Sequence, residues 1–204
     1  MVGTEALGRD IMILEVIHEK IKASIAVKQA ILEDENLIQQ IQKLAIDCVH
    51  SLQSGGKIIF AGNGGSFADA QHLSAEFISR FLFDRAALAS IVLGANNSSI
   101  SAIGNDYGYD QVFARELSGL AKERDIFIPI STSGNSKNIL EAVKKAKEIG
   151  TITVALTGAQ GGKMKDICDC INVPSEDTAR IQESHIMIGH IICGLVEEII
   201  FGNR

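Results

Sequence analysis

The 204-residue sequence predicts one α/β domain, with a doubly wound, five-stranded parallel sheet flanked by helices and an N-terminal helical extension. Three observations lead to this fold class. Short apolar runs, typical of buried parallel strands, alternate with longer segments of helical periodicity. Two of these runs lead through glycine- and serine-rich turns into helices. A long helical pattern also precedes the first apolar run. Such alternation favours parallel strands joined by right-handed crossovers.

The helical extension is expected within residues 1–55, where it packs on the core or between subunits as part of the same domain. Asp34 is a candidate N-cap for its second helix, and Gly55-Gly56 ends that helix. The remaining residues, 56–204, form the domain that would carry the site. Its strands are expected at 58–61, 87–93, 125–130, 151–156 and 171–173. Its helices are expected from 66, from 96, over 110–120, up to 149 and over 178–201.

Two local features bear on these boundaries. Pro129 lies inside the third apolar run, and because proline has no N–H to donate to a sheet, we expect the strand to end early or bulge there. Residues 104–108 combine glycine with short polar side chains, and we expect them to form a loop after the helix that begins near residue 96.

The composition is that of an acidic globular protein, with 46% hydrophobic residues, 22% charged residues and a net charge of −6. There is no basic run and no tryptophan, which argues against nucleic-acid binding, and the acidic balance argues against a membrane surface. The most apolar segment, 186–196, is too short to cross a membrane, and the charged first twenty residues do not resemble a secretory signal. The four cysteines form no C-x-x-C pair. We therefore expect a soluble, cytoplasmic protein with reduced thiols.

Two loops that follow expected strands are suited to binding phosphate. The first, residues 62–66, is rich in glycine and opens a helix whose free N–H groups attract anions. The second, residues 131–136, adds several hydroxyl groups that can donate to a phosphate monoester. Phe67 occupies the last glycine position of a G-x-G-x-x-G pattern, and no G-K-[ST] follows, so a dinucleotide or ATP is disfavoured. Both loops lie at carboxyl ends of strands, where open α/β sheets bind ligands.

A second set of polar residues has the character of a metal site. His72 and Glu76 are four residues apart on an expected helix, so they lie on one face as two metal ligands would. Taken alone, such a pair is more often a surface hydrogen bond. The last helix adds Gln182, His185 and His190 among apolar residues, where polar groups need partners. Since Gln182 and His190 are about 12 Å apart along the axis, spacing favours Gln182 with His185 as much as Gln182 with His190.

Five segments together resemble one protein family. They are GNGGS-x-ADAQH-x-x-AE, SAIGNDYG, STSGNS, GGKM and, near the C-terminus, DTARIQE-x-H-x-x-x-x-H. These segments are similar to those of the sedoheptulose-7-phosphate isomerases, or phosphoheptose isomerases, which are single-domain proteins of the sugar-isomerase (SIS) fold. The resemblance extends over residues 56–201, most of the chain.

The resemblance implies conversion of sedoheptulose 7-phosphate to D-glycero-D-manno-heptose 7-phosphate through an enediol, the first step of nucleotide-activated heptose synthesis for lipopolysaccharide or capsule. It places Glu76 as the base and His190 as the acid of this proton transfer. It implies a homotetramer with active sites between subunits. One Zn²⁺ per subunit would be held by His72, Glu76, Gln182 and His190. The implied substrate contacts are Asn63, Gly64, Gly65, Glu76, Asn105, Asp106, Ser131, Thr132, Ser133, Ser136 and Gln182.

One position departs from the family pattern, because Phe67 stands where a small or polar residue is expected beside the first loop. A pocket narrowed there gives weight to an alternative, an isomerase that acts on a pentose or hexose phosphate. A second alternative is a non-catalytic relative that binds sugar phosphates or recruits a partner protein. Loss of the zinc ligands would mark such a relative, whereas all four are present in this sequence.

Overall fold

The computed structural model describes residues 2–202, with side chains described from residue 12 onwards. Five parallel strands form one sheet in the order β2-β1-β3-β4-β5, which confirms the predicted fold class. Because β2 and β3 lie on opposite sides of β1, the chain winds in both directions from that strand. The carboxyl ends of β1 and β3 therefore meet at a topological switch point, where ligands bind in such folds. The strands are β1 (Ile58–Ala61), β2 (Ser90–Val92), β3 (Ile126–Ser131), β4 (Ile152–Gly158) and β5 (Asp169–Val173).

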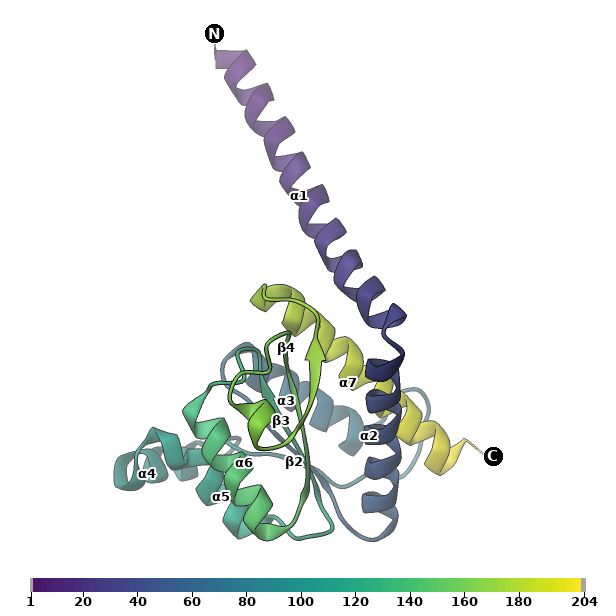
Figure 1. Ribbon diagram of the computed structural model, residues 1–204, viewed down its shortest axis with the longest axis vertical. Coiled ribbons are helices and arrows are strands. Elements are labelled where there is room, and N and C mark those ends of the chain that lie inside the picture. Colours follow the sequence, from purple (N-terminus) through teal and green to yellow (C-terminus); the bar gives the residue numbers. More distant parts are fainter. Residues whose placement is uncertain (1, 203–204) are drawn as a thin grey trace.

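Helices cover both faces of the sheet, and each face has its own apolar core (Figure 1). One core lies under α2 (Glu35–Gln53), α3 (Gly65–Ile78) and α7 (Thr178–Phe201). The other lies under α4 (Asn97–Tyr107), α5 (Val112–Leu120) and α6 (Lys137–Ile149). Single turns of 3₁₀ helix occur at Tyr109–Gln111 and Met164–Asp166. This packing brings α3 and α7 together on the first face, and these two helices carry the candidate metal ligands.

The N-terminal helix α1 (Val2–Glu33) projects away from the body of the molecule (Figure 1). Its exposed apolar side chains, described from residue 12, are Met12, Ile13, Leu14, Val16, Ile17, Ile21, Ile25 and Leu32. Asp34 caps the following helix as predicted, since its Oδ1 accepts hydrogen bonds from the N–H groups of Asn36 (3.0 Å) and Leu37 (3.1 Å). A division of the chain at residue 55 stays a prediction, although α2 packs in the same core as α7.

Three predictions about element boundaries were wrong. Strand β3 neither ends early nor bulges at Pro129, because its register with β4 is the same at Ile126 and at Ser131, on either side of the proline. The expected loop at residues 104–108 is instead the last turn of α4, which Gly108 ends with a φ of +87°. The second strand, β2, is shorter than residues 87–93, since only Ser90–Val92 pair with β1.

The C-terminal helix α7 illustrates why apolar length alone does not indicate a membrane span. All 24 of its residues form one helix, longer than the 186–196 segment, and it is long and apolar enough by composition to cross a membrane. It packs instead against α2, α3 and the sheet, where Ile181, Ile188, Ile192 and Val196 are buried. It is therefore a core helix. The four cysteines are free thiols, as predicted.

Candidate active site

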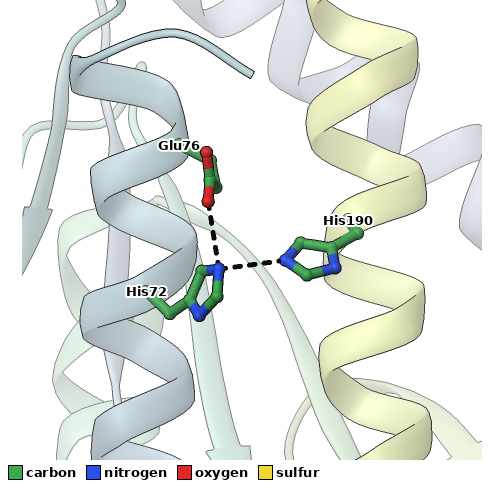
Figure 2. Close-up of side chains that lie close together, drawn as sticks. All are labelled: His72, Glu76 and His190. Atoms are coloured by element: carbon green, nitrogen blue, oxygen red, sulfur yellow. Dashed lines mark hydrogen bonds and ion pairs between the residues drawn. The ribbon is translucent and has the colours of Figure 1, made fainter. Parts of the chain in front are cut away.

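Three side chains from α3 and α7 converge on one point (Figure 2). The Nε2 atom of His72 lies 3.0 Å from Oε1 of Glu76 and 3.2 Å from Nε2 of His190. One ligand atom of each residue lies within 4.8 Å of the other two, and no other such group of three or more is found in the described part of the chain. Ligands of a tetrahedral zinc ion lie about 3.3 Å apart. The donor types and their spacing therefore fit a zinc site.

The cluster is open on one side and supported on another. The side chain of His72 is 52% exposed and that of Glu76 is 23% exposed. The ring of Phe81, which follows α3, stacks on the ring of His190 with 5.3 Å between centroids and 27° between planes. Three protein ligands with an open side are typical of catalytic zinc sites, which leave one coordination position for substrate or water.

The two histidines of α7 have different environments. His185 is fully buried, and its Nε2 lies 3.1 Å from the backbone oxygen of Thr157 on β4. Burial lowers the pKa of His185 to about 4, against the opposite effect of the hydrogen bond to Thr157. His185 is thus a neutral core histidine, whereas His190 faces His72. The structure therefore brings His190, and not His185, to His72 and Glu76, a choice that spacing left open.

Gln182 does not reach the metal cluster within one chain. Its amide lies against Gly65 at the start of α3, so closely that a Cβ at Gly65 would be 2.5 Å from Nε2 of Gln182. Seven residues of helix separate Gly65 from His72, which is about 10 Å along the axis. Because α3 and α7 run parallel, Gln182 lies beside the first glycine-rich loop while His190 lies two turns further along.

The two loops suited to phosphate, residues 62–66 and 131–136, lie at the carboxyl ends of the adjacent strands β1 and β3 and are called the phosphate-type loops. A pair of side-chain amides links the first loop to α6, the helix that follows the second loop. Asn63 Nδ2 donates to Asn138 Oδ1 and Asn138 Nδ2 donates to Asn63 Oδ1, each at 2.9 Å. In the second loop, the hydroxyl oxygens of Ser131 and Ser136 are 3.2 Å apart. Sequence reasoning missed Asn138, which is 4% exposed. The available signal was a polar residue on the apolar face of α6.

The GGKM segment has a structural role beside the second loop. Gly134 adopts a φ of +62°, and a Cβ at this residue would lie 2.1 Å from the backbone oxygen of Gly161. The N–H of Met164 donates to the oxygen of Gly134 (3.1 Å), and the N–H of Lys163 donates to Oδ1 of Asn135 (3.0 Å). This turn therefore holds the phosphate-type loop in place.

Two further predicted residues lie on α4, and Phe67 lies beside the first loop. Asn105 and Asp106 are exposed at the end of α4, and Asn105 Nδ2 donates to Asp106 Oδ1 (2.8 Å). Phe67 packs near Gly94 and lines a cavity of about 170 Å³ that also borders Gly62, Asn63 and Gly64.

A half-buried carboxylate on α3 was also missed by sequence reasoning. Asp69 lies on the same helix face as Gly65 and His72. Its Oδ2 is buried and has no hydrogen-bond partner among the described residues. Burial raises the pKa of Asp69, and the nearby His72 acts in the opposite direction. The only signal in the sequence was a carboxylate three residues before a candidate ligand.

Comparison with known proteins extends over most of the chain. The SIS domain family model matches residues 21–158. The chain is 56% identical over 191 residues to a phosphoheptose isomerase of Aneurinibacillus thermoaerophilus, which covers 93% of this chain and 96% of that relative. It is 54% identical over 180 residues to phosphoheptose isomerase 2 of Campylobacter jejuni, which covers 88% of this chain and 90% of that relative.

Solved structures agree with the sequence comparison. A phosphoheptose isomerase from Francisella tularensis superimposes with a TM-score of 0.86 at 34% identity, covering 91% of this chain and 98% of that one. A phosphoheptose isomerase from Neisseria gonorrhoeae gives a TM-score of 0.84 at 39% identity, covering 91% and 99%. Both the sequence and the fold therefore place this chain in the phosphoheptose isomerase family of SIS-domain proteins.

Proposed function

We propose that this chain is a metal-dependent aldose–ketose isomerase that converts sedoheptulose 7-phosphate to D-glycero-D-manno-heptose 7-phosphate. One observation carries the proposal: His72, Glu76 and His190 converge on one point in a chain that is 56% identical to a phosphoheptose isomerase. A non-catalytic relative would have no need of this cluster. The proposed place of the reaction is the cytoplasm, at the start of nucleotide-activated heptose synthesis.

Substrate binding begins at the two loops on the switch point of the sheet. The hydroxyls of Ser131, Ser133 and Ser136, with the free N–H groups that start α6, are suited to hold the phosphate group. Thr132 adds a fourth hydroxyl group. The first loop, at residues 63–65, and the side chains of Asn105 and Asp106 are proposed to contact the sugar. The proposed role of Gln182 as a substrate contact is supported by its place beside Gly65.

Isomerisation moves one proton between C1 and C2 and another between their oxygens. Glu76 is the proposed base for the carbon-bound proton, because a carboxylate has two oxygens and only Oε1 faces His72. Its other oxygen would be available to accept a proton if Oε1 were a ligand of the ion. His190 is the proposed acid for the oxygen-bound proton. Since it offers a single nitrogen to the cluster, this role requires that Nε2 is not bound to the ion at that step.

The proposed ion is Zn²⁺, one per subunit, held by His72, Glu76 and His190. When bound, it would act as a Lewis acid that polarises the substrate carbonyl. Gln182 is the fourth ligand that the family resemblance implies, but within one chain it lies about two helical turns from His72. A Gln182 from a second copy of the chain would resolve this distance, which agrees with the proposed homotetramer with shared active sites.

Apolar surface on two parts of the molecule supports assembly. Exposed apolar side chains extend along α1, which projects from the body. A second apolar surface surrounds His190 and is lined by Phe81, Leu82, Ile186, Met187, Ile191, Gly194 and Leu195. Apolar patches of this kind mark protein interfaces. A subunit seated beside His190 would bring a second chain to the metal cluster.

The base is tested by Glu76→Gln, with Glu148→Gln on the exposed face of α6 as the matched control. We expect Glu76→Gln to lose about 10²-fold or more of kcat, the usual contribution of a general base, while the substrate still binds. The control keeps wild-type kcat. Full activity of Glu76→Gln would refute the assignment. Assays with five-, six- and seven-carbon ketose phosphates decide the sugar, and preference for a shorter sugar would support the alternative based on Phe67.

A further inference from the structure

A completely buried ion pair lies at the far end of the two helices that carry the metal ligands. The Nε atom of Arg85 lies 2.8 Å from Oε1 of Glu197, and the two side chains are 1% and 0% exposed. Arg85 comes from the segment 79–86 that follows α3, and Glu197 lies on α7, two turns after His190. Burying two charged side chains is costly unless their remaining donors and acceptors also form hydrogen bonds. The partners of this ion pair therefore indicate what it contributes to the structure.

Glu197 ties α7 to the segment after α3. Its Oε1 accepts from the backbone N–H of Phe81 (3.1 Å), and its Oε2 accepts from that of Leu82 (2.6 Å). Burial would raise the pKa of Glu197, but these two N–H groups and the Arg85 guanidinium outweigh burial and lower it. The carboxylate is therefore ionised and binds the two peptide N–H groups on either side of the Phe81 Cα atom.

Arg85 ties the same segment to the last turn of α3. Its Nη2 donates to the backbone oxygen of Glu76, and its Nη1 donates to that of Phe77, both at 2.7 Å. A third bond reaches the oxygen of Ser79 at 2.9 Å. The last carbonyl groups of a helix have no partner within the helix, so the guanidinium completes the end of α3. One of the residues it holds by the backbone is the proposed base.

These contacts involve both helices of the metal cluster and the ring that stacks on His190. The ion pair joins α3, which carries His72 and Glu76, to α7, which carries His190. One of the two N–H groups that Glu197 binds belongs to Phe81, whose ring stacks on His190. A change at the ion pair would thus alter both the spacing of the two helices and the support of one imidazole ring.

We propose that Arg85 and Glu197 are positioning residues of the metal site, which hold Glu76 and His190 in the geometry that binds the ion. The inference rests on the proposed metal-dependent function. Neither side chain touches the ion or the substrate. They act through the backbone of α3 and through the ring of Phe81, as outer partners of metal ligands do when they orient those ligands.

A second buried carboxylate provides a matched control. Asp125 is 1% exposed and, like Glu197, accepts two backbone N–H groups and one cation: the N–H of Lys57 (3.0 Å), the N–H of Lys122 (2.8 Å) and Nζ of Lys57 (2.6 Å). It directly precedes β3, and its hydrogen bonds go to residues outside α3 and α7. Asp125→Asn therefore removes a similar buried charge that does not join the two helices of the cluster.

The experiment compares Zn²⁺ dissociation constants of the wild type, Glu197→Gln, Asp125→Asn and Phe81→Leu by competition with a chromophoric chelator, below the melting temperature of each. We expect both carboxylate variants to melt at lower temperature. Only Glu197→Gln should bind Zn²⁺ more weakly, by about 10- to 100-fold, the range found for outer partners of ligands. Phe81→Leu, which keeps an apolar side chain but removes the stacked ring, should weaken binding in the same direction.

Equal Zn²⁺ affinity in the wild type and in folded Glu197→Gln would overturn the inference. It would also be overturned if Asp125→Asn lost as much Zn²⁺ affinity as Glu197→Gln. If Glu197→Gln does not fold, Phe81→Leu decides, and wild-type affinity in that variant overturns the inference. A wild-type protein that binds no Zn²⁺ would instead refute the proposed metal site itself. The two failures are therefore distinguishable.

Discussion

The buried side chain of His185 makes the stability of the protein depend on pH. The side chain is fully buried on the inner side of α7, and Nε2 lies 3.1 Å from the oxygen of Thr157. That oxygen can only accept, so Nε2 carries the proton and donates it. A second proton would have to go on Nδ1, which is buried without a hydrogen-bond partner among the described residues.

The sign and size of the effect follow from the two pKa values. Burial lowers the pKa of His185 from 6.5 to about 4 in the folded protein. Below pH 6.5 the unfolded chain therefore binds a proton that the folded protein excludes, so the free energy of unfolding falls as pH falls. The difference between the two pKa values corresponds to a loss of about 3 kcal/mol in the free energy of unfolding, which is reached near pH 4. Between pH 7.5 and pH 5 the loss from this residue is about 2 kcal/mol.

The assay is urea unfolding at these two pH values, at one protein concentration and in the presence of a chelator. His185→Gln keeps an N–H donor but cannot titrate, so its loss of stability between the two pH values should be about 2 kcal/mol smaller than that of the wild type. His50→Gln, at an exposed position of α2, should keep the wild-type dependence. Equal losses in His185→Gln and the wild type would refute the argument.

Two further predictions concern the substrate loops. Gly65→Ala should displace the amide of Gln182, because the new Cβ would lie 2.5 Å from its Nε2; we expect KM to rise, and an unchanged KM would remove Gln182 from the substrate site. Asn138→Leu should break the amide pair with Asn63 and leave that side chain without its buried partner, at a cost of about 1–3 kcal/mol in stability. It should also raise KM for the sugar phosphate, and wild-type KM in this variant would show that the amide pair does not position the loop.

Local apolar pattern was sufficient to predict the sheet and most helices. The run Ile58–Ala61 is buried at every position, which is what a central parallel strand requires. The errors arose where local signals compete with the rest of the fold. Pro129 lies in a central strand whose register with β4 is the same on both sides of the proline. Gly104 and Asp106 continue α4 because helix packing outweighs their weak preference for turns.

The candidate site was predictable as far as it lies within single segments. His72 and Glu76 follow from helical spacing, and the loop at residues 131–136 follows from its hydroxyl groups. Contacts between segments that lie far apart in the sequence could not be predicted. The amide pair of Asn63 and Asn138 forms only because of how α6 packs on the sheet. The residues alone could not decide between His190 and His185, because that choice depends on how α7 packs. Spacing along one helix carries no information about its neighbours.

The dependence of isomerisation on a bound divalent ion is the central claim, and one titration tests it most directly. The protein is treated with a chelator, and the conversion of sedoheptulose 7-phosphate is followed as Zn²⁺ is added back, with His190→Ala in parallel. The chelated wild type should be inactive and should regain full activity at one Zn²⁺ per subunit, whereas His190→Ala should not recover. Full activity of the chelated, zinc-depleted wild type would contradict the account.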